Sequence, residues 1–212
     1  MSEIRLTEIS IPIAAYFLGT IPFGLILGKL FGGKDVRKAG SGNIGATNVS
    51  RVAGPVAGIL TLLLDAAKGS AAVILAARLA SESALWMMIA GFLALIGHCF
   101  PLWLRFKGGK GVATAAGVFL ALCPLAMLGA LLLFILVAAF WRYVSLGSIT
   151  AAAAIPLLMY LLWAPGHAPP HVVTFGSLAI ALLVIYKHDA NIQRLVEGEE
   201  PKFSFRKKEG AE

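Results

Sequence analysis

Residues 84–114 read ALWMMIAGFLALIGHCFPLWLRFKGGKGVAT, and this stretch decides the class of fold. Its first two thirds are apolar, interrupted mainly by Gly97 and His98, and about twenty such residues are enough for a helix to cross a bilayer. The run ends abruptly in the glycines and lysines of residues 107–111. The stretch therefore predicts a membrane-spanning helix that opens, at one membrane face, into a basic, glycine-rich loop.

The whole chain has the composition of an integral membrane protein. Of its 212 residues 58% are hydrophobic and 14% are charged, and the mean hydropathy is +0.84. Soluble domains carry about 25% charged residues. We therefore expect a single all-α membrane domain over residues 1–212. The N-terminal MSEIRLTEIS lacks a basic leader region and a cleavage site, so residues 11–31 are expected to be a span that stays in the protein.

Cysteines and histidines predict no metal or disulfide chemistry. Cys99 and Cys123 lie inside apolar runs, far from any C-x-x-C spacing, and are expected to be buried apolar residues. The four histidines are scattered along the chain and provide no metal-ligand cluster.

Apolar segments alternate with polar, glycine-rich segments along the chain. The apolar segments lie near residues 9–31, 52–80, 84–104, 112–141, 146–163 and 171–187. Residues 112–141 are too few for two full spans at about 1.5 Å per residue. We expect this segment to form a short helical hairpin that turns near Cys123 and Pro124. One long crossing is the alternative.

Basic residues determine the expected orientation in the membrane. They cluster within residues 29–51 and 105–110, at Arg142 and from Lys187 onward, whereas Arg5 and Arg78 lie apart. By the positive-inside rule these clusters are cytoplasmic. A hairpin over residues 112–141 keeps them on one side. It gives about seven transmembrane helices, some short, with the N-terminus outside and the C-terminus cytoplasmic. One long crossing would place the basic tail outside, against the rule.

The first of three polar segments on this side is KAGSGNIGATNVSR, residues 38–51, which combines glycines, hydroxyls, amides and Arg51. Glycine lets successive backbone N–H groups point at one anion, and the next helix would begin here with its positive end. We interpret the segment as an anion-binding loop. An ordinary solvated loop is the alternative.

The second polar segment is GHCFPLWLRFKGGKGVAT, residues 97–114. Gly108, Gly109 and Gly111 precede a predicted helix N-terminus, with Lys107 and Lys110 beside them, which is typical of phosphate binding. No G-x-x-x-x-G-K-[ST] match occurs, so a nucleotide is not implied. On its own, the loop is explained equally well as a flexible basic anchor at the membrane face.

The third polar segment is YKHDANIQRLVEGEE, residues 186–200, in which His188 and Asn191 share one helix face. Nearby, Ser145 and Ser148 either act as hydroxyl donors or bond back to their own helix.

Other polar residues have simpler interpretations. Asp65 and Lys68 are three residues apart inside an apolar segment and are interpreted as a structural ion pair. His167 and His171 fall in a predicted outer loop and are interpreted as incidental.

Together the three segments suit a site for two phosphates, one of them on a substrate apolar enough to enter from the bilayer. A cytoplasm-facing anion or lipid-phosphate transporter is the main alternative. It would need a polar path through the membrane midplane and usually internal repeats. No convincing repeat is visible, and apart from Asp65 and Lys68 the polar residues gather at one face. A membrane assembly subunit without chemistry would leave the face of His188 and Asn191 unexplained.

The three segments, in this order and spacing, resemble the three motifs of the bacterial membrane acyl-phosphate:glycerol-3-phosphate acyltransferases. GSGNIGATNVSR matches the first motif, GHCFPLWLRFKGGKGVAT the second and KHDANIQRLVEGEE the third, over nearly the whole chain. The resemblance implies that a fatty acyl phosphate acylates the 1-hydroxyl of sn-glycerol 3-phosphate. The products would be 1-acyl-sn-glycerol 3-phosphate (lysophosphatidic acid) and phosphate, in phospholipid biosynthesis.

The same resemblance implies a cellular setting. The protein would lie in the bacterial cytoplasmic (inner) membrane with its active site on the cytoplasmic face. It would need no cofactor or metal, bind no nucleic acid and act downstream of an acyl-phosphate-forming enzyme. Soluble and peripheral glycerolipid acyltransferases use an H-x-x-x-x-D pair instead, and no histidine here is followed by Asp at that spacing.

The resemblance also assigns roles to individual residues. Glycerol 3-phosphate would be bound by Ser41, Arg51, Lys110, Ser148, His188 and Asn191. Acyl phosphate would be bound by Gly42, Asn43, Gly45, Thr47, Gly108, Gly109 and Gly111. Glu199 resembles the family's structural glutamate.

Catalysis would rest on His188, Asn191 and Lys110. His188 is one candidate to accept the proton of the attacking hydroxyl. Alternatively, the phosphate of the donor takes that proton, and His188 and Asn191 only orient the glycerol. We favour this positioning role, because an acyl phosphate already carries a good leaving group.

Overall fold

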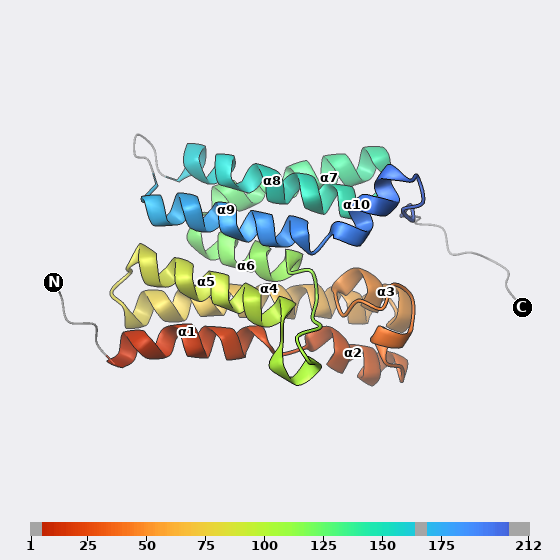
Figure 1. Ribbon diagram of the computed structural model, residues 1–212, viewed down its shortest axis with the longest axis horizontal. Helices are drawn as coiled ribbons and strands as arrows, with labels where there is room; N and C mark the ends of the chain where they lie inside the picture. The colour runs from red at the N-terminus through yellow and green to blue at the C-terminus, as the bar shows by residue number, and fades with distance from the viewer. Residues whose placement is uncertain (1–5, 164–168, 204–212) are drawn as a thin grey trace, which may run out of the picture.

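The computed structural model describes residues 6–163 and 169–203 of the chain (Figure 1). These residues form helices and turns, and no β-strand occurs among them. The α-helices are α1 (Leu6–Gly19), α2 (Phe23–Gly32), α3 (Ala46–Ala53), α4 (Pro55–Leu79), α5 (Ala84–Cys99), α6 (Val112–Leu122), α7 (Pro124–Trp141), α8 (Val144–Leu162), α9 (His171–Tyr186) and α10 (Asp189–Val196). Two short 3-10 helices, η1 (Val36–Lys38) and η2 (Leu102–Leu104), lie in the loops before α3 and α6.

Prolines mark where several helices begin or break. Pro55 and Pro124 occupy the first turns of α4 and α7, where a missing backbone N–H costs no helical hydrogen bond. Pro22 separates α1 from α2 within the continuous apolar segment Ile9–Gly32. The first apolar segment of the sequence is therefore a broken helix.

Two groups of long helices lie side by side, with α6 between them (Figure 1). In one group α1, α4 and α5 pack against one another, and in the other α7 packs on α8 and α8 on α9. Glycines allow α6 to dock closely on α4, because a side chain at Gly69 would overlap the Thr114 carbonyl and one at Gly117 the Ala66 carbonyl. Small residues at close helix contacts are typical of membrane helix packing.

The outer surface of this bundle is apolar. Phe140, Phe175 and Leu132 are 78%, 68% and 58% exposed, respectively, which suits contact with lipid. Among the described residues, five helical segments are long and apolar enough to cross a membrane, or six if the bent pair α9 and α10 counts as one. Helix α6 has 11 residues and so is only about 16 Å long, short of a bilayer core. An all-α membrane fold is confirmed, whereas the count of seven and the sides of the termini stay predictions.

The chain reverses between α6 and α7, as predicted for residues 112–141. Helix α6 ends and α7 begins at Cys123. Val112, at the start of α6, and Phe134, in the second half of α7, line the same cavity, so α7 runs back toward the start of α6 (Figure 1). The alternative of one long crossing is therefore wrong. Cys99 and Cys123 are buried free thiols, as expected.

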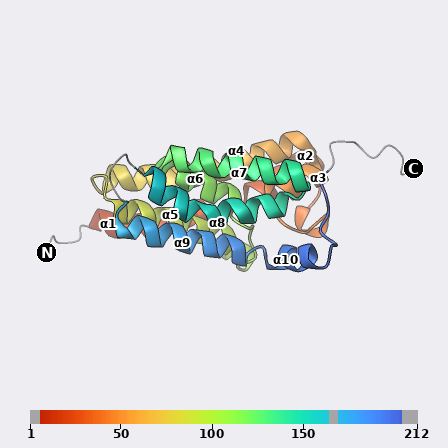
Figure 2. The same ribbon diagram turned by 90° about the horizontal axis from the view of Figure 1, so that it is seen from above.

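Basic residues gather at one end of the bundle, which we call the basic end. Helices α2, α3 and α10 lie there, and Figure 2 shows the start of α1 at the opposite end. The basic end carries Lys29, Arg37, Arg51, Arg142 and Arg194. Arg78 lies in the last turn of α4, at the other end of the bundle. Arg5 lies outside the described residues.

Candidate active site

The loop before α3 is folded around one buried side chain, that of Asn48. Its Oδ1 accepts a hydrogen bond from the Ser41 N–H (2.8 Å), and its Nδ2 donates to the carbonyls of Val36 (2.9 Å) and Asn43 (2.8 Å). Asn48 is 2% exposed. Gly40 has φ +60° and lies against Asn48 Oδ1, where a side chain would overlap that atom. No role for Asn48 was apparent from the sequence, and in the structure its side chain shapes the loop.

This loop ends at the N-terminus of α3. Asn43 Oδ1 accepts a hydrogen bond from the Gly45 N–H (2.8 Å), and Gly45 caps the helix. The first helical N–H groups lack helical partners and carry the positive end of the helix dipole. Asn43, Gly45 and Thr47 line a cavity together with Arg51, one turn further along α3.

The loop before α6 uses its glycines differently. The Gly108 N–H donates to the Cys99 carbonyl and the Gly109 N–H to the His98 carbonyl, each at 3.1 Å. Side chains at either position would overlap His98. Neither glycine is among the residues lining the cavity, whereas Lys110 and Gly111 are. The geometry gives no support to the prediction that Gly108 and Gly109 bind phosphate, because both N–H groups already have carbonyl partners.

The prediction for Gly42 lacks support from the geometry for a similar reason. Its N–H donates to the Ala39 carbonyl at 3.1 Å, and it is not among the residues that line the cavity.

The third polar segment lines the same cavity. Helices α9 and α10 meet at an angle of 59°, and His188 lies in the break between them. His188 Nδ1 is 2.7 Å from the Val184 carbonyl. Because a carbonyl only accepts, Nδ1 carries the proton and Nε2 is left as an acceptor. Asn191, in the first turn of α10, accepts a hydrogen bond from Lys110 Nζ and so joins the second segment to the third.

Glu200, and not Glu199, holds this region together. Its Oε1 accepts hydrogen bonds from Ser145 Oγ and Asn191 Nδ2, both at 2.6 Å, and its Oε2 accepts one from Arg194 Nε at 2.8 Å. Burial raises the pKa of Glu200, but these three hydrogen bonds outweigh it and lower the pKa below its ordinary value.

The structure therefore gives the contacts expected of a structural glutamate to Glu200 and not to Glu199. Gly198 has φ +75°, and in the turn that it makes the Glu199 side chain is exposed while Glu200 points inward. Sequence spacing alone could not distinguish two adjacent glutamates.

All three segments meet at one cavity of about 660 Å³ at the basic end. The cavity brings together all six residues predicted to bind glycerol 3-phosphate: Ser41, Arg51, Lys110, Ser148, His188 and Asn191. Ser148 is buried and donates to the Val144 carbonyl at 2.9 Å, the back-bonding alternative noted from the sequence. Its oxygen keeps its capacity to accept a hydrogen bond.

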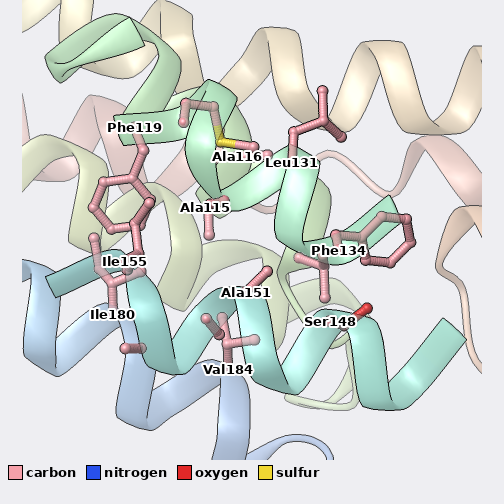
Figure 3. A pocket seen from close by; sticks show the side chains of 15 residues that line it. Ala115, Ala116, Phe119, Leu131, Phe134, Ser148, Ala151, Ile155, Ile180 and Val184 are labelled. Atoms are coloured by element: carbon pink, nitrogen blue, oxygen red, sulfur yellow. The ribbon is translucent and has the colours of Figure 1, made fainter. Parts of the chain in front are cut away.

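A second, apolar cavity adjoins the first and is shown in Figure 3. It measures about 80 Å³ and lies between α6, α7, α8 and α9. Phe119, Ile155 and Ile180 extend into it at one end, and Ser148 lies beside Phe134 at the other. Val112, Phe134 and Ser148 line both cavities. A polar compartment and an apolar compartment therefore lie next to each other and share part of their walls.

Burial lowers the pKa of both central titratable groups, Lys110 and His188, but leaves them in different charge states at pH 7. Burial lowers the pKa of Lys110 to about 8, although the Glu200 carboxylate opposes the shift, so the ammonium is mostly charged at pH 7. Burial lowers the pKa of His188 to about 4, and the imidazole is neutral at pH 7. The cavity thus presents cations from Lys110 and Arg51 next to a neutral hydrogen-bond acceptor.

The predicted pair of Asp65 and Lys68 is present, with Lys68 Nζ 2.8 Å from Asp65 Oδ1. The pair has a third member that was not predicted from the sequence: His98, whose Nδ1 lies 2.9 Å from Lys68 Nζ. Asp65 and His98 also line the polar cavity.

His171 lies away from the site. His171 begins α9 at the end of the bundle opposite the basic end (Figure 1), and His167 lies outside the described residues. Across residues 6–163 and 169–203, no group of three or more His, Cys, Asp or Glu side chains could hold a metal ion.

Comparison with known proteins agrees with this geometry. The sequence model of the family described as glycerol-3-phosphate acyltransferase matches residues 9–198. The glycerol-3-phosphate acyltransferase of Syntrophotalea carbinolica is 52% identical over 191 residues, which cover 90% of this chain and 95% of the relative.

Two solved structures have the same fold. They are crystal structures of PlsY (YgiH), an integral membrane glycerol 3-phosphate acyltransferase, in its glycerol 3-phosphate and lysophosphatidic acid forms. The first is 39% identical with a TM-score of 0.86 and covers 93% of this chain and 96% of its own. The second is 38% identical with a TM-score of 0.83 and covers 93% of this chain and 95% of its own. The chain described here therefore belongs to the glycerol-3-phosphate acyltransferase family.

Proposed function

We propose that the protein transfers the acyl group of a fatty acyl phosphate to the 1-hydroxyl of sn-glycerol 3-phosphate, releasing 1-acyl-sn-glycerol 3-phosphate and phosphate. One observation carries this proposal: a cavity lined by cations and hydroxyls adjoins an apolar cavity between membrane helices and shares lining residues with it. One compartment suits a phosphorylated polar acceptor, and the other suits the chain of a lipid donor.

The polar compartment provides partners for the phosphate of the acceptor. Arg51 and Lys110 provide two cations from different segments, and charge-assisted hydrogen bonds to phosphate are strong. The Ser41 hydroxyl and the first turn of α3 add donors beside them. A relative of the same fold was solved in a glycerol 3-phosphate form, which supports this acceptor.

The apolar compartment favours a donor with a long chain. Apart from Ser148, all of its lining residues are apolar. We expect the carbonyl end of the chain to lie near Ser148 and the chain to continue between the helices toward lipid. The lysophosphatidic acid form of the related structure supports an acylated product. We favour acyl phosphate as the donor because the resemblance to the acyl-phosphate-using family implies it. Asn43 and Thr47 line the polar compartment as further polar partners beside those assigned to the acceptor. The Gly45 N–H is not counted among them, because it already donates to Asn43 Oδ1.

The reaction balances without a covalent enzyme intermediate. The oxygen of the 1-hydroxyl forms a bond to the acyl carbon, the bond from that carbon to the phosphate oxygen breaks, and phosphate leaves with the electron pair. The hydroxyl proton passes to the departing phosphate. His188, with a pKa near 4, is a weak base, and its Nε2 instead accepts a hydrogen bond that orients the hydroxyl. Lys110 neutralises developing negative charge.

We infer that this site lies on the cytoplasmic face of the bacterial cytoplasmic membrane. The cavity lies at the basic end, and the positive-inside rule places that end in the cytoplasm. Seven crossings, with the broken helix of α1 and α2 as the first and the short α6 as the fourth, would put the N-terminus outside and the C-terminus inside.

Acyl transfer by the purified protein tests the function. We would supply glycerol 3-phosphate with palmitoyl phosphate, palmitoyl-CoA or palmitoyl-carrier protein, in lipid cubic phase, and follow phosphate release and lysophosphatidic acid. Turnover is expected with palmitoyl phosphate alone. Turnover with the thioesters would reject the proposed donor. No turnover with any donor, by folded protein, would reject the proposed reaction.

A further inference from the structure

A buried polar cluster lies beneath the loop that carries Lys110, and the chemistry above does not use it. It consists of Asp65 and Lys68 on α4 and His98 near the end of α5, with side chains 3%, 1% and 4% exposed. Lys68 Nζ donates to the Ile21 carbonyl at 2.9 Å, in the break between α1 and α2. It also lies 2.8 Å from Asp65 Oδ1 and 2.9 Å from His98 Nδ1. The cluster fixes the imidazole from one side.

Gly109 lies on the other side of that imidazole. The atom nearest to a methyl group added at Gly109 would be His98 Nε2, and the methyl would overlap the ring. The Gly109 N–H donates to the His98 carbonyl at 3.1 Å, so backbone and ring of one residue hold the same glycine. Lys110 follows directly, and its ammonium bonds Asn191 at the cavity.

We propose that His98, held by Lys68 and Asp65, is a positioning residue for Lys110. The ring limits how closely the Gly108–Lys110 backbone can approach His98. This fixes where the Lys110 ammonium lies relative to the substrate phosphate. The inference rests on the proposed function, since it assumes that Lys110 binds the phosphate of glycerol 3-phosphate. Two observations support it apart from that assumption: no space separates Gly109 from the ring, and His98 and Asp65 line the cavity that Lys110 enters.

A double-mutant cycle with KM and kcat as separate readouts tests the proposal. Gly109→Ala and His98→Ala should each raise KM for glycerol 3-phosphate about tenfold, with kcat changed less than about threefold. In the double variant the methyl group enters the space that the ring leaves. Its KM should therefore lie at least about fivefold below the product of the two single effects.

Gly108 provides a matched control in the same loop. Neither Gly108 nor Gly109 has positive φ, so alanine meets no backbone strain at either position. A methyl group at Gly108 would overlap the backbone carbonyl of His98, which His98→Ala leaves in place. Gly108→Ala should therefore raise KM without any rescue by His98→Ala.

Two results would overturn the positioning role. One is a Gly109→Ala, His98→Ala double variant whose KM equals the product of the two single effects, as is expected for Gly108→Ala with His98→Ala. The other is a set of variants whose thermal stability falls while KM stays at the wild-type value. If His98→Ala gives no folded protein, His98→Asn replaces it in the same cycle. Asparagine keeps an acceptor for Lys68 but lacks the ring atom nearest Gly109.

Failure of the proposed function is distinguishable from failure of this inference. Turnover of palmitoyl phosphate by the wild-type protein and by Lys107→Ala establishes the function, and the cycle then tests His98 alone. Without wild-type turnover the proposed function fails. The same cycle, measured as calorimetric affinity for glycerol 3-phosphate, still decides whether His98 positions Lys110.

Discussion

The two glycine-rich loops, before α3 and before α6, look alike in sequence and differ in what their glycines contact. Each combines glycines with cations ahead of a helix N-terminus. The first wraps around the Asn48 side chain and turns Ser41, Asn43 and Gly45 toward the cavity. In the second, Gly108 and Gly109 press on His98, and Lys110 alone carries charge into the cavity.

The contrast between the two loops shows that a glycine-rich sequence does not by itself indicate a binding site. Glycine marks a place where something approaches the backbone closely. The sequence does not say whether that neighbour is a phosphate or a side chain of the same protein. Here the first loop is held by a buried amide and lines the cavity with polar side chains, and the second is packed on His98 and supports one cation.

We expect the replacement of Lys110 to have the largest effect on activity. A small effect would mean that the second loop does not act through this one cation. Lys110→Ala should lower kcat/KM for glycerol 3-phosphate by about a hundredfold, because it removes a charged hydrogen bond in a partly buried site. Lys107→Ala is the matched control, since Lys107 is exposed and is not among the cavity-lining residues. Steady-state acyl transfer measures both. Equal losses would mean that the loop acts only through its overall charge.

Removal of the Asn48 amide should have the next largest effect and tests the first loop. Asn48→Ala leaves the Ser41 N–H and the carbonyls of Val36 and Asn43 without this partner. We expect a loss of about 2–3 kcal/mol, or about 4–12 °C in Tm. Asn43→Ala removes one side-chain hydrogen bond and should cost less than half as much. Thermal unfolding in detergent compares the variants, and a larger loss in Asn43→Ala would contradict the role of Asn48.

Glu200 accepts a hydrogen bond from Asn191, which in turn accepts one from Lys110 in the second loop. A neutral variant of Glu200 tests this connection. Glu200→Gln should destabilise the protein by about 1–2 kcal/mol, because Arg194 loses a charged partner. Activity should fall as well, since Asn191 orients Lys110. Glu199→Gln changes an exposed side chain and should leave both quantities unchanged. The reverse pattern in Tm and kcat/KM would restore Glu199 as the structural glutamate.

The pH dependence should show the smallest of these effects. Lys110 has a pKa lowered to about 8, so its charge is complete well below that pH and is lost above it. The substrate phosphate stays dianionic throughout, because its second pKa is about 6. We expect kcat/KM to fall about tenfold for each pH unit above 8. Lys110→Arg should remove this decline, because arginine stays protonated. A decline that persists in Lys110→Arg would assign it to another group.

Much of the architecture could be predicted from the sequence, for physical reasons. Apolar length and the distribution of Lys and Arg indicate a helical membrane protein whose polar segments meet at one end. The reversal at Cys123 followed from the length of residues 112–141. All six residues assigned to glycerol 3-phosphate line one cavity, because their motifs meet at the basic end.

The parts that failed depend on short-range geometry that spacing does not encode. Which glycines face a ligand depends on where the chain folds back, as at Gly108 on the end of α5. Which of two adjacent glutamates points inward depends on the φ of Gly198. The roles of Asn48 and His98 arise from contacts with distant backbone and side chains.

A crystal structure of the protein with glycerol 3-phosphate would test the central claim most directly. The account predicts phosphate oxygens within about 3.2 Å of both the Arg51 guanidinium and Lys110 Nζ, with a glycerol hydroxyl facing His188 Nε2. Phosphate bound instead at the exposed turn of Arg105 and Lys107, with the cavity between the three segments unoccupied, would contradict it.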